Sequence, residues 1–509
     1  MSLAIVNSLA MSGLKALAVR VEVHLAPGLP SFSLVGMASA GVKESRERVR
    51  SAIASSGFSF PDGRVTVNLA PADLPKESGR YDLPIALGVL LASGQIHEAE
   101  NTPATALHHY IVLGELSLTG AIEPVIDALG CALSHGSGAF TLIMSPVSAG
   151  IAAQVPGVKV LQAETLAQVV AYFSGLAPLK AGRAPESQPI RHDVACLSEV
   201  KGQAQARRVL EISASGGHSL LMSGPPGTGK SMLAQRLPGL LPRLPLADAL
   251  QVSALQGHGS AESLPASDLA PFRAPHHSAS LAALVGGGAR PRPGEISMAH
   301  HGVLFLDELP HFQSRALESL REPLETGEVS IARAVGSITF PARFLLVAAM
   351  NPCPCGWQGQ TRKTCSCTPD AITRYRGRLS GPFLDRIDLQ ISLPVQEKSW
   401  LKLPPGEPSS VVAQRVQRCR HRQMQRQGCV NASLNVSGIG RHCRLEAEAT
   451  NLLEHCIEKW HWSARVVHRV LRVARTIADM ADSATLGAEH LGEAAQYRQP
   501  WRHEGRAGS

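Results

Sequence analysis

The chain has 509 residues, of which 44% are hydrophobic and 18% charged, and its formal net charge is +8. This length suffices for about three domains, and the composition excludes an intrinsically disordered chain. The basic balance favours a polyanionic partner. No apolar stretch reaches the ~18 residues that a membrane span needs, and the opening residues lack the features of a signal peptide. We therefore expect a cytoplasmic protein with no membrane partner.

Four regions follow one another along the chain. Residues 1–175 alternate short β-like runs with helical stretches, which predicts an α/β or α+β domain. Residues 176–193 are polar and rich in proline, as in a linker. Residues 194–394 show strand–loop–helix alternation, and residues 395–509 are expected to be mostly helical. One late helix should bury an apolar face made of Val466, Val470, Val473 and Ile477.

The segment SGPPGTGKS follows an apolar strand and precedes a helix, which is the context of a phosphate-binding loop. Backbone N–H groups of such a loop surround phosphate oxygens, and the helix N-terminus adds partial positive charge. Lys230 would reach the β- and γ-phosphates, and the Ser231 hydroxyl would bind Mg²⁺. The residues predicted to hold ATP are Gly224, Pro225, Pro226, Gly227, Thr228, Gly229, Lys230 and Ser231.

Two carboxylates follow the apolar run VLFL, a strand that is typical of a parallel sheet covered on both faces. Asp307 is predicted to hold Mg²⁺ through water, and Glu308 to polarise the water that attacks ATP. A helix N-cap after a core strand would give a similar pattern. We favour the catalytic interpretation because a phosphate-binding loop lies upstream.

A third apolar strand, FLLVAAM, ends at Asn351. An amide at this place can orient the attacking water or sense the γ-phosphate. Its position after the first two motifs favours that role over a structural one.

The three strand ends in this order resemble those of AAA+ ATPases. The segments GGGARPRPGEISMAHHGVLFLDELPHF, GEVSIARAVGSITFPARF and GPFLDRIDLQI resemble the ComM/YifB-like family of the magnesium-chelatase-like branch, and the likeness covers essentially the whole chain. The resemblance implies an AAA+ core with a parallel sheet and a helical lid, preceded by a Lon-protease-like α+β domain. It also implies a homo-hexameric ATP-dependent DNA translocase or helicase that promotes branch migration during natural transformation. The partners implied are single-stranded and branched DNA and the strand-exchange recombinase.

The resemblance also assigns two arginines to catalysis. Arg386, in LDRID, matches the arginine finger that reaches a nucleotide bound by a neighbouring subunit. Arg465, in SAR, matches the second sensor, which is also presented across a subunit interface. A salt-bridged surface arginine is the alternative for each.

Two segments are predicted to face DNA. FRAPHHSASLAALVGGGARPRPGEISMAHHG resembles the helix-2 insertion of the clade. Adjacent histidines in one strand point in opposite directions, so for its two histidine pairs we expect packing or phosphate contacts rather than metal ligation. GEVSIARAVGSITFPARF predicts a hairpin, and Arg333 near its tip is expected either to contact phosphate or to be a solvated turn charge.

Four cysteines follow Asn351 as two pairs. Their thiolates would satisfy a closed, tetrahedral, structural Zn²⁺ site, although reduced thiols and an iron–sulfur cluster remain open as alternatives. The predicted ligands are Cys353, Cys355, Cys365 and Cys367. Arg362 and Lys363 lie between the pairs and would be available to DNA or to a neighbouring subunit.

The N-terminal region resembles the Lon-protease fold without its Ser–Lys dyad. Ile85 occupies the position of the nucleophile in DLPIA, and the lysine position falls at about Leu129. Covalent catalysis needs an activated nucleophile, so we expect a scaffold and not a protease.

Two other functions are compatible with these motifs. One is a magnesium-chelatase-like motor subunit, and the other is a regulator that uses ATP only as a switch. Stimulation of ATP hydrolysis by DNA would favour the translocase over both.

Overall fold

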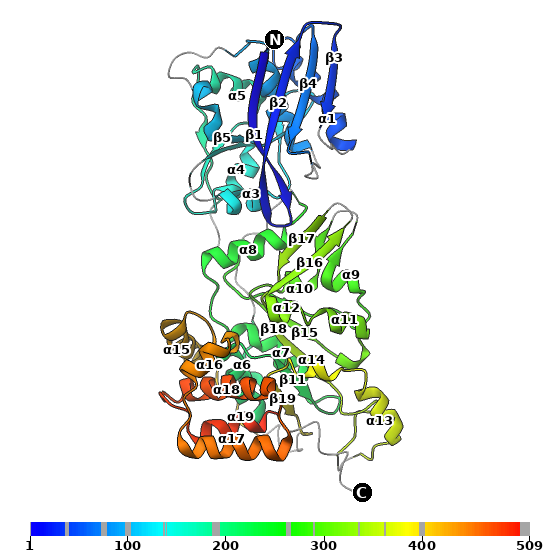
Figure 1. Ribbon diagram of the computed structural model, residues 1–509, viewed down its shortest axis with the longest axis vertical. Coiled ribbons are helices and arrows are strands. Elements are labelled where there is room, and N and C mark those ends of the chain that lie inside the picture. The colour runs from blue at the N-terminus through cyan, green and yellow to red at the C-terminus, as the bar shows by residue number, and fades with distance from the viewer. Residues whose placement is uncertain are drawn as a thin grey trace.

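The computed structural model has three regions: the first lies at one end of the long axis, and the second and third lie side by side toward the other end (Figure 1). The first contains a large sheet, the second a parallel sheet, and the third is helical. The structure describes residues 2–35, 40–72, 79–96, 103–135, 138, 140–185, 194–260, 266–288, 291–333, 336–360, 363–395 and 403–498.

The first region is built on an eight-stranded mixed sheet of order β10-β9-β8-β5-β1-β2-β4-β3. A long antiparallel hairpin, β1 paired with β2, leads the chain into it. The strands are β1 (Ser2–Ser12), β2 (Lys15–Ala26), β3 (Ser31–Val35), β4 (Arg64–Ala70), β5 (Tyr110–Val112), β8 (Thr141–Met144), β9 (Lys159–Gln162) and β10 (Lys180–Ala181). β10 lies inside the predicted linker, so the sheet extends further along the chain than residue 175.

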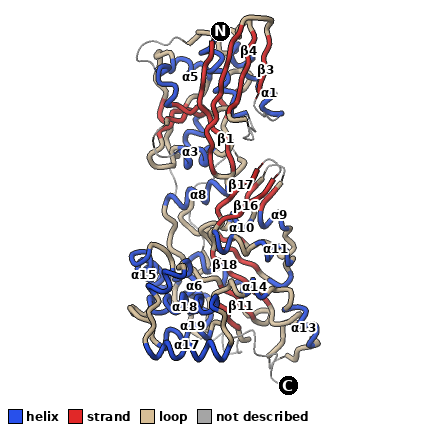
Figure 2. The backbone as a smooth tube through the Cα atoms, viewed as in Figure 1, coloured by secondary structure: helices blue, strands red, loops and turns tan. Residues whose placement is uncertain are grey.

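Helices, drawn in blue in Figure 2, lie beside this sheet, and a short two-stranded ladder accompanies them. The helices are α1 (Ala40–Ser55), α2 (Asp82–Ala92), α3 (Ala128–His135), α4 (Pro146–Ala152) and α5 (Leu166–Phe173), and the ladder joins β6 (Glu115–Leu116) to β7 (Ile122–Glu123). Almost every residue of α2 is buried, because this apolar helix packs on β1 and β2 inside the domain. A helix that is apolar on all sides belongs in a core.

The second region contains a five-stranded sheet of order β12-β15-β18-β11-β19, in which all neighbours are parallel. Its strands are β11 (Leu220–Ser223), β12 (Phe272–Arg273), β15 (Val303–Leu306), β18 (Leu345–Met350) and β19 (Leu389–Ser392). β11, β15 and β18 are buried throughout, as expected for strands covered on both faces. The carboxyl ends of parallel strands meet at one edge, where ligands of such sheets bind.

Short helices and two hairpins surround this sheet. They are α6 (Ala204–Gly216), α7 (Lys230–Arg236), α8 (Leu246–Gln256), α9 (Leu281–Val285), α10 (Glu295–Met298), α11 (Ser314–Ser319), α12 (Pro323–Thr326), α13 (Pro369–Arg376) and α14 (Gly381–Leu384), with β13 (Gly286–Gly287), β14 (Arg292–Pro293), β16 (Glu328–Arg333) and β17 (Gly336–Pro341). The register of β16 on β17 pairs Arg333 with Gly336, which confirms the predicted hairpin.

The third region is helical, as expected. Its helices are α15 (Ser409–Gln427), α16 (Val436–His442), α17 (Ala447–Trp460), α18 (Ala464–Met480) and α19 (Ala488–Gln496). The four predicted apolar residues of α18 are all buried, which confirms that face. They pack in one core with α6 and the β11–β19 side of the sheet, so the helical region and the parallel sheet share a hydrophobic core.

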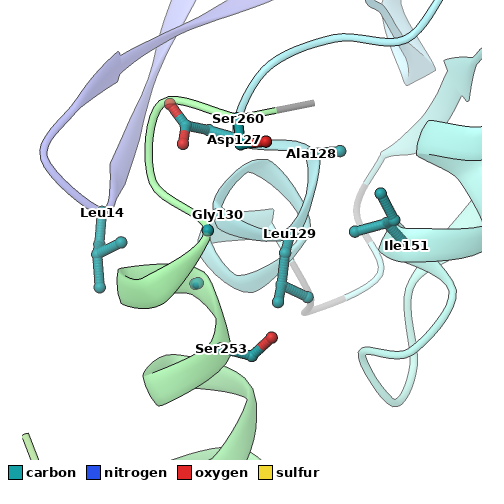
Figure 3. A pocket seen from close by; sticks show the side chains of 10 residues that line it. Leu14, Asp127, Ala128, Leu129, Gly130, Ile151, Ser253 and Ser260 are labelled. Atoms are coloured by element: carbon teal, nitrogen blue, oxygen red, sulfur yellow. The ribbon is translucent and has the colours of Figure 1, made fainter. Parts of the chain in front are cut away.

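The first and second regions meet where α3 packs on α8 (Figure 3). Asp127 has a positive φ of 61°, and its carboxylate accepts a hydrogen bond of 2.8 Å from the Gly259 amide and contacts His258 at 3.1 Å. Leu250 and Ala254 of α8 join the apolar cluster beneath the first sheet. Near Gly13, at the tip of the β1–β2 hairpin, the space for a side chain is closed by β17. Both contacts tie the first region to the elements that frame the parallel sheet.

Across the ranges described above, no helix combines the length and the apolar character that crossing a membrane requires.

Candidate functional site

The predicted phosphate-binding loop connects β11 to α7 at the carboxyl edge of the parallel sheet. Gly227 and Gly229 have φ values of 79° and 82°, which glycine adopts readily and other residues rarely do. The Lys230 ammonium donates to the carbonyl oxygens of Gly224 (2.7 Å) and Pro225 (2.9 Å) and to Asn351 Oδ1 (3.1 Å). The structure thus brings the predicted lysine and the predicted sensor amide into direct contact.

The Lys230 side chain is largely buried. Burial lowers its pKa, and the nearby carboxylates Asp307 and Glu308 act in the opposite direction. A buried ammonium flanked by carboxylates is well placed to attract an anion that approaches together with a divalent cation.

The predicted Mg²⁺ ligands come together from the start of α7 and from the residue that follows β15. The Ser231 hydroxyl, at the start of α7, donates a hydrogen bond of 2.6 Å to Asp307 Oδ2. Asp307 follows β15, and its other oxygen accepts from the Glu308 amide at 2.9 Å. A hydroxyl and a carboxylate are hard oxygen ligands of the kind that Mg²⁺ prefers. The residues present therefore fit a magnesium nucleotide at this edge.

Glu308 stands apart from Asp307 in conformation and in partners. Its φ is 52°, a value that non-glycine residues rarely adopt and that is found at functional sites. Its Oε2 atom lies 3.1 Å from Nδ1 of His277 and 3.4 Å from Nδ1 of His311. The side chain is half exposed, so it is accessible to water beside the predicted magnesium site.

His277, one member of the first histidine pair, contacts residues from another part of the chain. His276 bonds to Ser278, whereas its neighbour His277 reaches Glu308 and His311 from other segments. The potential ligand atoms of these three residues lie within 4.8 Å of one another. The partners of His277 are distant in the chain, so the spacing of the histidine pairs does not indicate this contact.

The four predicted zinc ligands converge. Three Sγ–Sγ distances are 3.4 Å (Cys353–Cys355), 3.6 Å (Cys353–Cys365) and 3.5 Å (Cys355–Cys365), and Cys367 lies within 4.8 Å of the other sulfurs. Zn–S bonds of about 2.3 Å in a tetrahedron place sulfurs about 3.8 Å apart. The donor set and its spacing therefore fit a structural zinc ion.

The four-cysteine loop packs directly against the phosphate-binding loop. Gly356 has a φ of 82°, and a Cβ atom at this position would lie 2.6 Å from Pro226 Cδ. Close packing of this kind transmits the position of one loop to the other. The four-cysteine loop therefore supports the phosphate-binding loop from one side.

Gly356→Ala is expected to weaken ATP binding about tenfold, because the added methyl group must displace Pro226 and because alanine is strained at this φ. Titration with a fluorescent ATP analogue measures this. Gly440→Ala is the matched control, since nothing lies within 4 Å of a Cβ atom there. Equal nucleotide affinity of Gly356→Ala and Gly440→Ala would contradict a supporting role for the loop.

The two predicted catalytic arginines lie at the opposite edge of the sheet from the phosphate-binding loop. Arg386 lies three residues before β19, which runs parallel to β11, and Arg465 lies in the first turn of α18. Both line a cleft of about 1080 Å³ that also includes Ser219 and Leu345, residues at the amino ends of β11 and β18. Neither arginine therefore faces the nucleotide site of its own chain.

The predicted DNA-facing residues are only partly described. Arg333 ends β16, and its side chain lies outside the described atoms, as does the whole of Arg362. The Lys363 ammonium lies 5.1 Å from the centroid of the Trp357 ring, a cation–π contact. Lys363 is exposed on the cysteine loop and is held by this ring.

Ile85 and Leu129, the positions compared with the protease dyad, are both buried in apolar clusters. Ile85 belongs to the core of the first sheet, and Leu129 to the cluster beside α8. The nearby helix α1 is held by the ion pair between Arg48 and the buried Asp82 at 2.7 Å. These positions contribute packing.

Gln203 is a site residue that the motifs did not predict. Its amide donates a hydrogen bond of 2.8 Å to the carbonyl oxygen of Thr228 in the phosphate-binding loop. Its φ of 47° is unusual for glutamine. Its position in KGQAQARR, before a helix, carries no motif that would have identified it.

Comparison with known proteins gives matches along nearly the whole chain. Residues 196–401 match the family model "Magnesium chelatase, subunit ChlI", residues 21–148 match "Subunit ChlI of Mg-chelatase", and residues 406–498 match "Magnesium chelatase, subunit ChlI C-terminal". With the parallel sheet and the helical C-terminal region, these matches define a magnesium-chelatase-like protein.

Individual relatives narrow this class. The uncharacterized protein YifB of Escherichia coli (strain K12) is 47% identical over 504 residues, covering 98% of this chain and 97% of that protein. Competence protein ComM of Haemophilus influenzae is 45% identical over 511 residues, covering 98% of each. The magnesium-chelatase 38 kDa subunit of Cereibacter sphaeroides is 27% identical over 174 residues, which is 31% of this chain and 52% of that protein. The chain belongs to the family of YifB and ComM.

Proposed function

We propose that the protein is an AAA+ ATP hydrolase that works as a homo-hexameric DNA translocase or helicase in the cytoplasm. The observation that carries this proposal is the meeting of Lys230, Ser231, Asp307 and Asn351 at the carboxyl edge of the parallel sheet. The strand order supports it, since β11 lies between β18 and β19 and ends in the phosphate-binding loop. By analogy with the name of ComM, the biological setting proposed is natural transformation, with branch migration as the DNA reaction.

In the proposed reaction each residue has a distinct task. The loop amides and Lys230 hold the phosphate chain, and Ser231 and Asp307 hold the magnesium ion, which neutralises charge on the β- and γ-phosphates. Glu308 accepts a proton from the attacking water as a general base. Asn351, which already contacts Lys230, orients that water or the γ-phosphate.

The proposed hydrolytic site is completed by a second subunit. Arg386 and Arg465 lie at the edge away from their own phosphate-binding loop, so they would serve the ATP of a neighbour in a ring. A heterologous, head-to-tail interface of this kind closes into a ring when the rotation between subunits allows it. Because each subunit supplies half of a site, ATP turnover should depend on assembly.

The DNA-dependent part of the proposal is tested by ATP turnover with and without single-stranded and branched DNA at increasing salt. We expect strong stimulation that declines with salt, because the contacts are to phosphate and release counterions. Arg333 is proposed as one of these contacts, and Arg362 and Lys363 as others. Turnover that does not change with DNA would favour the alternatives of a magnesium-chelatase-like motor subunit or an ATP-switched regulator.

The likeness to the magnesium-chelatase 38 kDa subunit covers a smaller part of the chain than the likeness to YifB and ComM. A metal-inserting motor is therefore the second candidate. It would hydrolyse ATP in the same site without a need for DNA. Measuring ATP turnover with and without DNA at increasing salt distinguishes this metal-inserting motor from the DNA translocase.

We also propose that the four cysteines hold zinc. Elemental analysis of protein that has not been exposed to a chelator should give one zinc per chain. The variant Cys353→Ser should lose most of this zinc, because Cys353 is the buried ligand. Metal binding contributes on the order of 10 kcal/mol to the folding of such a loop, so the variant should also melt at a lower temperature. Less than half a zinc per wild-type chain would contradict the assignment, and iron would indicate a cluster instead.

A further inference from the structure

The arginine cleft at the amino edge of the parallel sheet has a strongly positive lining. Seven arginines and three carboxylates line it. The arginines are Arg243, Arg343, Arg386, Arg420, Arg465, Arg469 and Arg472, and the carboxylates are Asp248, Glu325 and Asp388. Clustered guanidinium groups repel one another unless an anion lies among them, so the cleft is built for a polyanion.

Three arginines of this cleft also have buried N–H donors that lack an acceptor among the described residues. The Nε atoms of Arg386, Arg469 and Arg472 are buried, and within the described part of the chain no atom accepts a hydrogen bond from them. The Arg386 side chain is only 6% exposed. Buried donors in native proteins are usually paired, so three unpaired Nε atoms in one cleft show that these guanidinium groups are not fully satisfied within the described part of the chain.

One carboxylate of the cleft, that of Glu325, lies between Arg386 and Arg465. Its Oε1 atom lies 2.7 Å from Nη2 of Arg386 and 3.4 Å from Nη2 of Arg465. A single oxygen therefore joins the two arginines that are proposed to serve the neighbour's ATP. The Glu325 side chain is 46% exposed, so an incoming phosphate can replace it.

The position of Glu325 in the fold links this contact to the hairpin. Glu325 lies on α12, which ends at Thr326, and β16 begins at Glu328. Thr326 Oγ1 bonds to the backbone of Glu328 at both its N–H and its C=O. A movement of Glu325 is therefore passed within three residues to the base of the β16–β17 hairpin.

We propose that Glu325 is a positioning residue that takes the place of a phosphate group between Arg386 and Arg465 until the γ-phosphate of a neighbouring subunit's ATP displaces it. The proposal rests on the shared site described under Proposed function. A triphosphate carries more charge than one carboxylate, so it wins the competition for the two arginines. The released Glu325 then frees α12, and the hairpin responds to the nucleotide of the adjacent subunit.

The test compares Glu325→Gln with Glu322→Gln, which removes the same charge from an exposed residue beside the same helix. Among the described residues the Glu322 carboxylate forms no ion pair. Loss of the competing carboxylate should lower the KM for ATP about two- to tenfold, the usual range for ion pairs that are partly exposed. It should also reduce the ratio of DNA-stimulated to basal turnover, whereas Glu322→Gln should behave as wild type.

A second readout does not depend on hydrolysis. In a Glu308→Gln background, the ATP concentration at half-assembly, measured by analytical ultracentrifugation, should fall about two- to tenfold when Glu325→Gln is added. Unchanged KM, unchanged stimulation and unchanged assembly would reduce Glu325 to an ordinary ion pair and overturn the inference. A fall in kcat at constant KM would overturn it as well, since it would place Glu325 in the reaction itself. If wild-type turnover were absent or independent of assembly, the proposed function would fail first, and this inference with it.

Discussion

Glu308→Gln is expected to lower ATP turnover by about 10²- to 10⁴-fold, the usual contribution of a general base. The amide cannot accept a proton from water. Lys230, Ser231 and Asp307 remain in place, so the affinity for ATP should stay within about threefold of wild type, as for a change that acts only on the transition state. Steady-state turnover and equilibrium binding of a fluorescent ATP analogue measure the two effects separately.

Glu458→Gln is the control for this change, because it removes the same charge at an exposed position of α17. It should leave both turnover and binding unchanged. Normal turnover in Glu308→Gln would mean that another group activates the water. Loss of ATP binding would mean that Glu308 supports the phosphate site and is not its general base.

Asp479→Ala is expected to destabilise the helical region by about 3–5 kcal/mol, the cost of leaving buried charges without their partner. The Asp479 side chain is 3% exposed. Its oxygens accept hydrogen bonds from Arg426, from Arg475 at 3.1 Å and from Asn431 at 2.8 Å. Arg475 is itself only 1% exposed, so the substitution leaves a buried guanidinium group without its carboxylate partner.

Thermal and urea unfolding of the full chain measure this effect. The chain has several regions and need not unfold in one step, so the transition to follow is that of the helical region. Tryptophan fluorescence reports it in a background that keeps Trp460 and Trp462 and replaces the other three tryptophans by phenylalanine. Asp482→Asn is the control, because asparagine tolerates the φ of 61° at this position. The partner Arg422 and the Asp482 side chain are exposed, at 36% and 74%, and exposed pairs contribute about 0–1 kcal/mol. Equal stability of the two variants would contradict a structural role for the buried network.

The parts of the site that lie on contiguous motifs were predictable from the sequence. The phosphate-binding loop, Asp307 with Glu308, and Asn351 each follow a short apolar strand, and parallel strands bring such ends together. Their meeting through Lys230 and Asn351 follows from this geometry. The hairpin and the apolar face of α18 were predictable for a similar reason, since each is set by local periodicity.

Contacts between distant segments were not predictable in this way. His277 meets Glu308 and His311 only because three loops converge, and Gly356 meets Pro226 only because two loops share one edge. The burial of Arg475 does not follow from the helical pattern, because the pair that it forms with Asp479 is buried by α15, which brings Arg426 to Asp479 from a distant part of the chain. The β1–β2 hairpin is only partly indicated by the sequence, because VRVEVH in β2 alternates apolar and polar residues, whereas β1 shows no such alternation.

The contacts of Glu325 in the arginine cleft were not predictable from the sequence either. Nothing in the sequence around PLETGE indicates that its carboxylate joins two arginines from later segments. The pairing follows from the placement of α12, α14 and α18 around one cleft, and only the folded chain shows it.

The most direct test of the shared site is a mixture of two variants that are each inactive alone, Lys230→Ala and Arg386→Ala. The first lacks a working nucleotide site but keeps its arginine, and the second has the reverse defect. If Arg386 serves the neighbouring subunit, an equal mixture should recover about a quarter of wild-type ATP turnover, because random head-to-tail assembly restores that fraction of interfaces. If the mixture stays inactive although size measurements show mixed rings, Arg386 acts within its own subunit or not at all, and the shared site is contradicted.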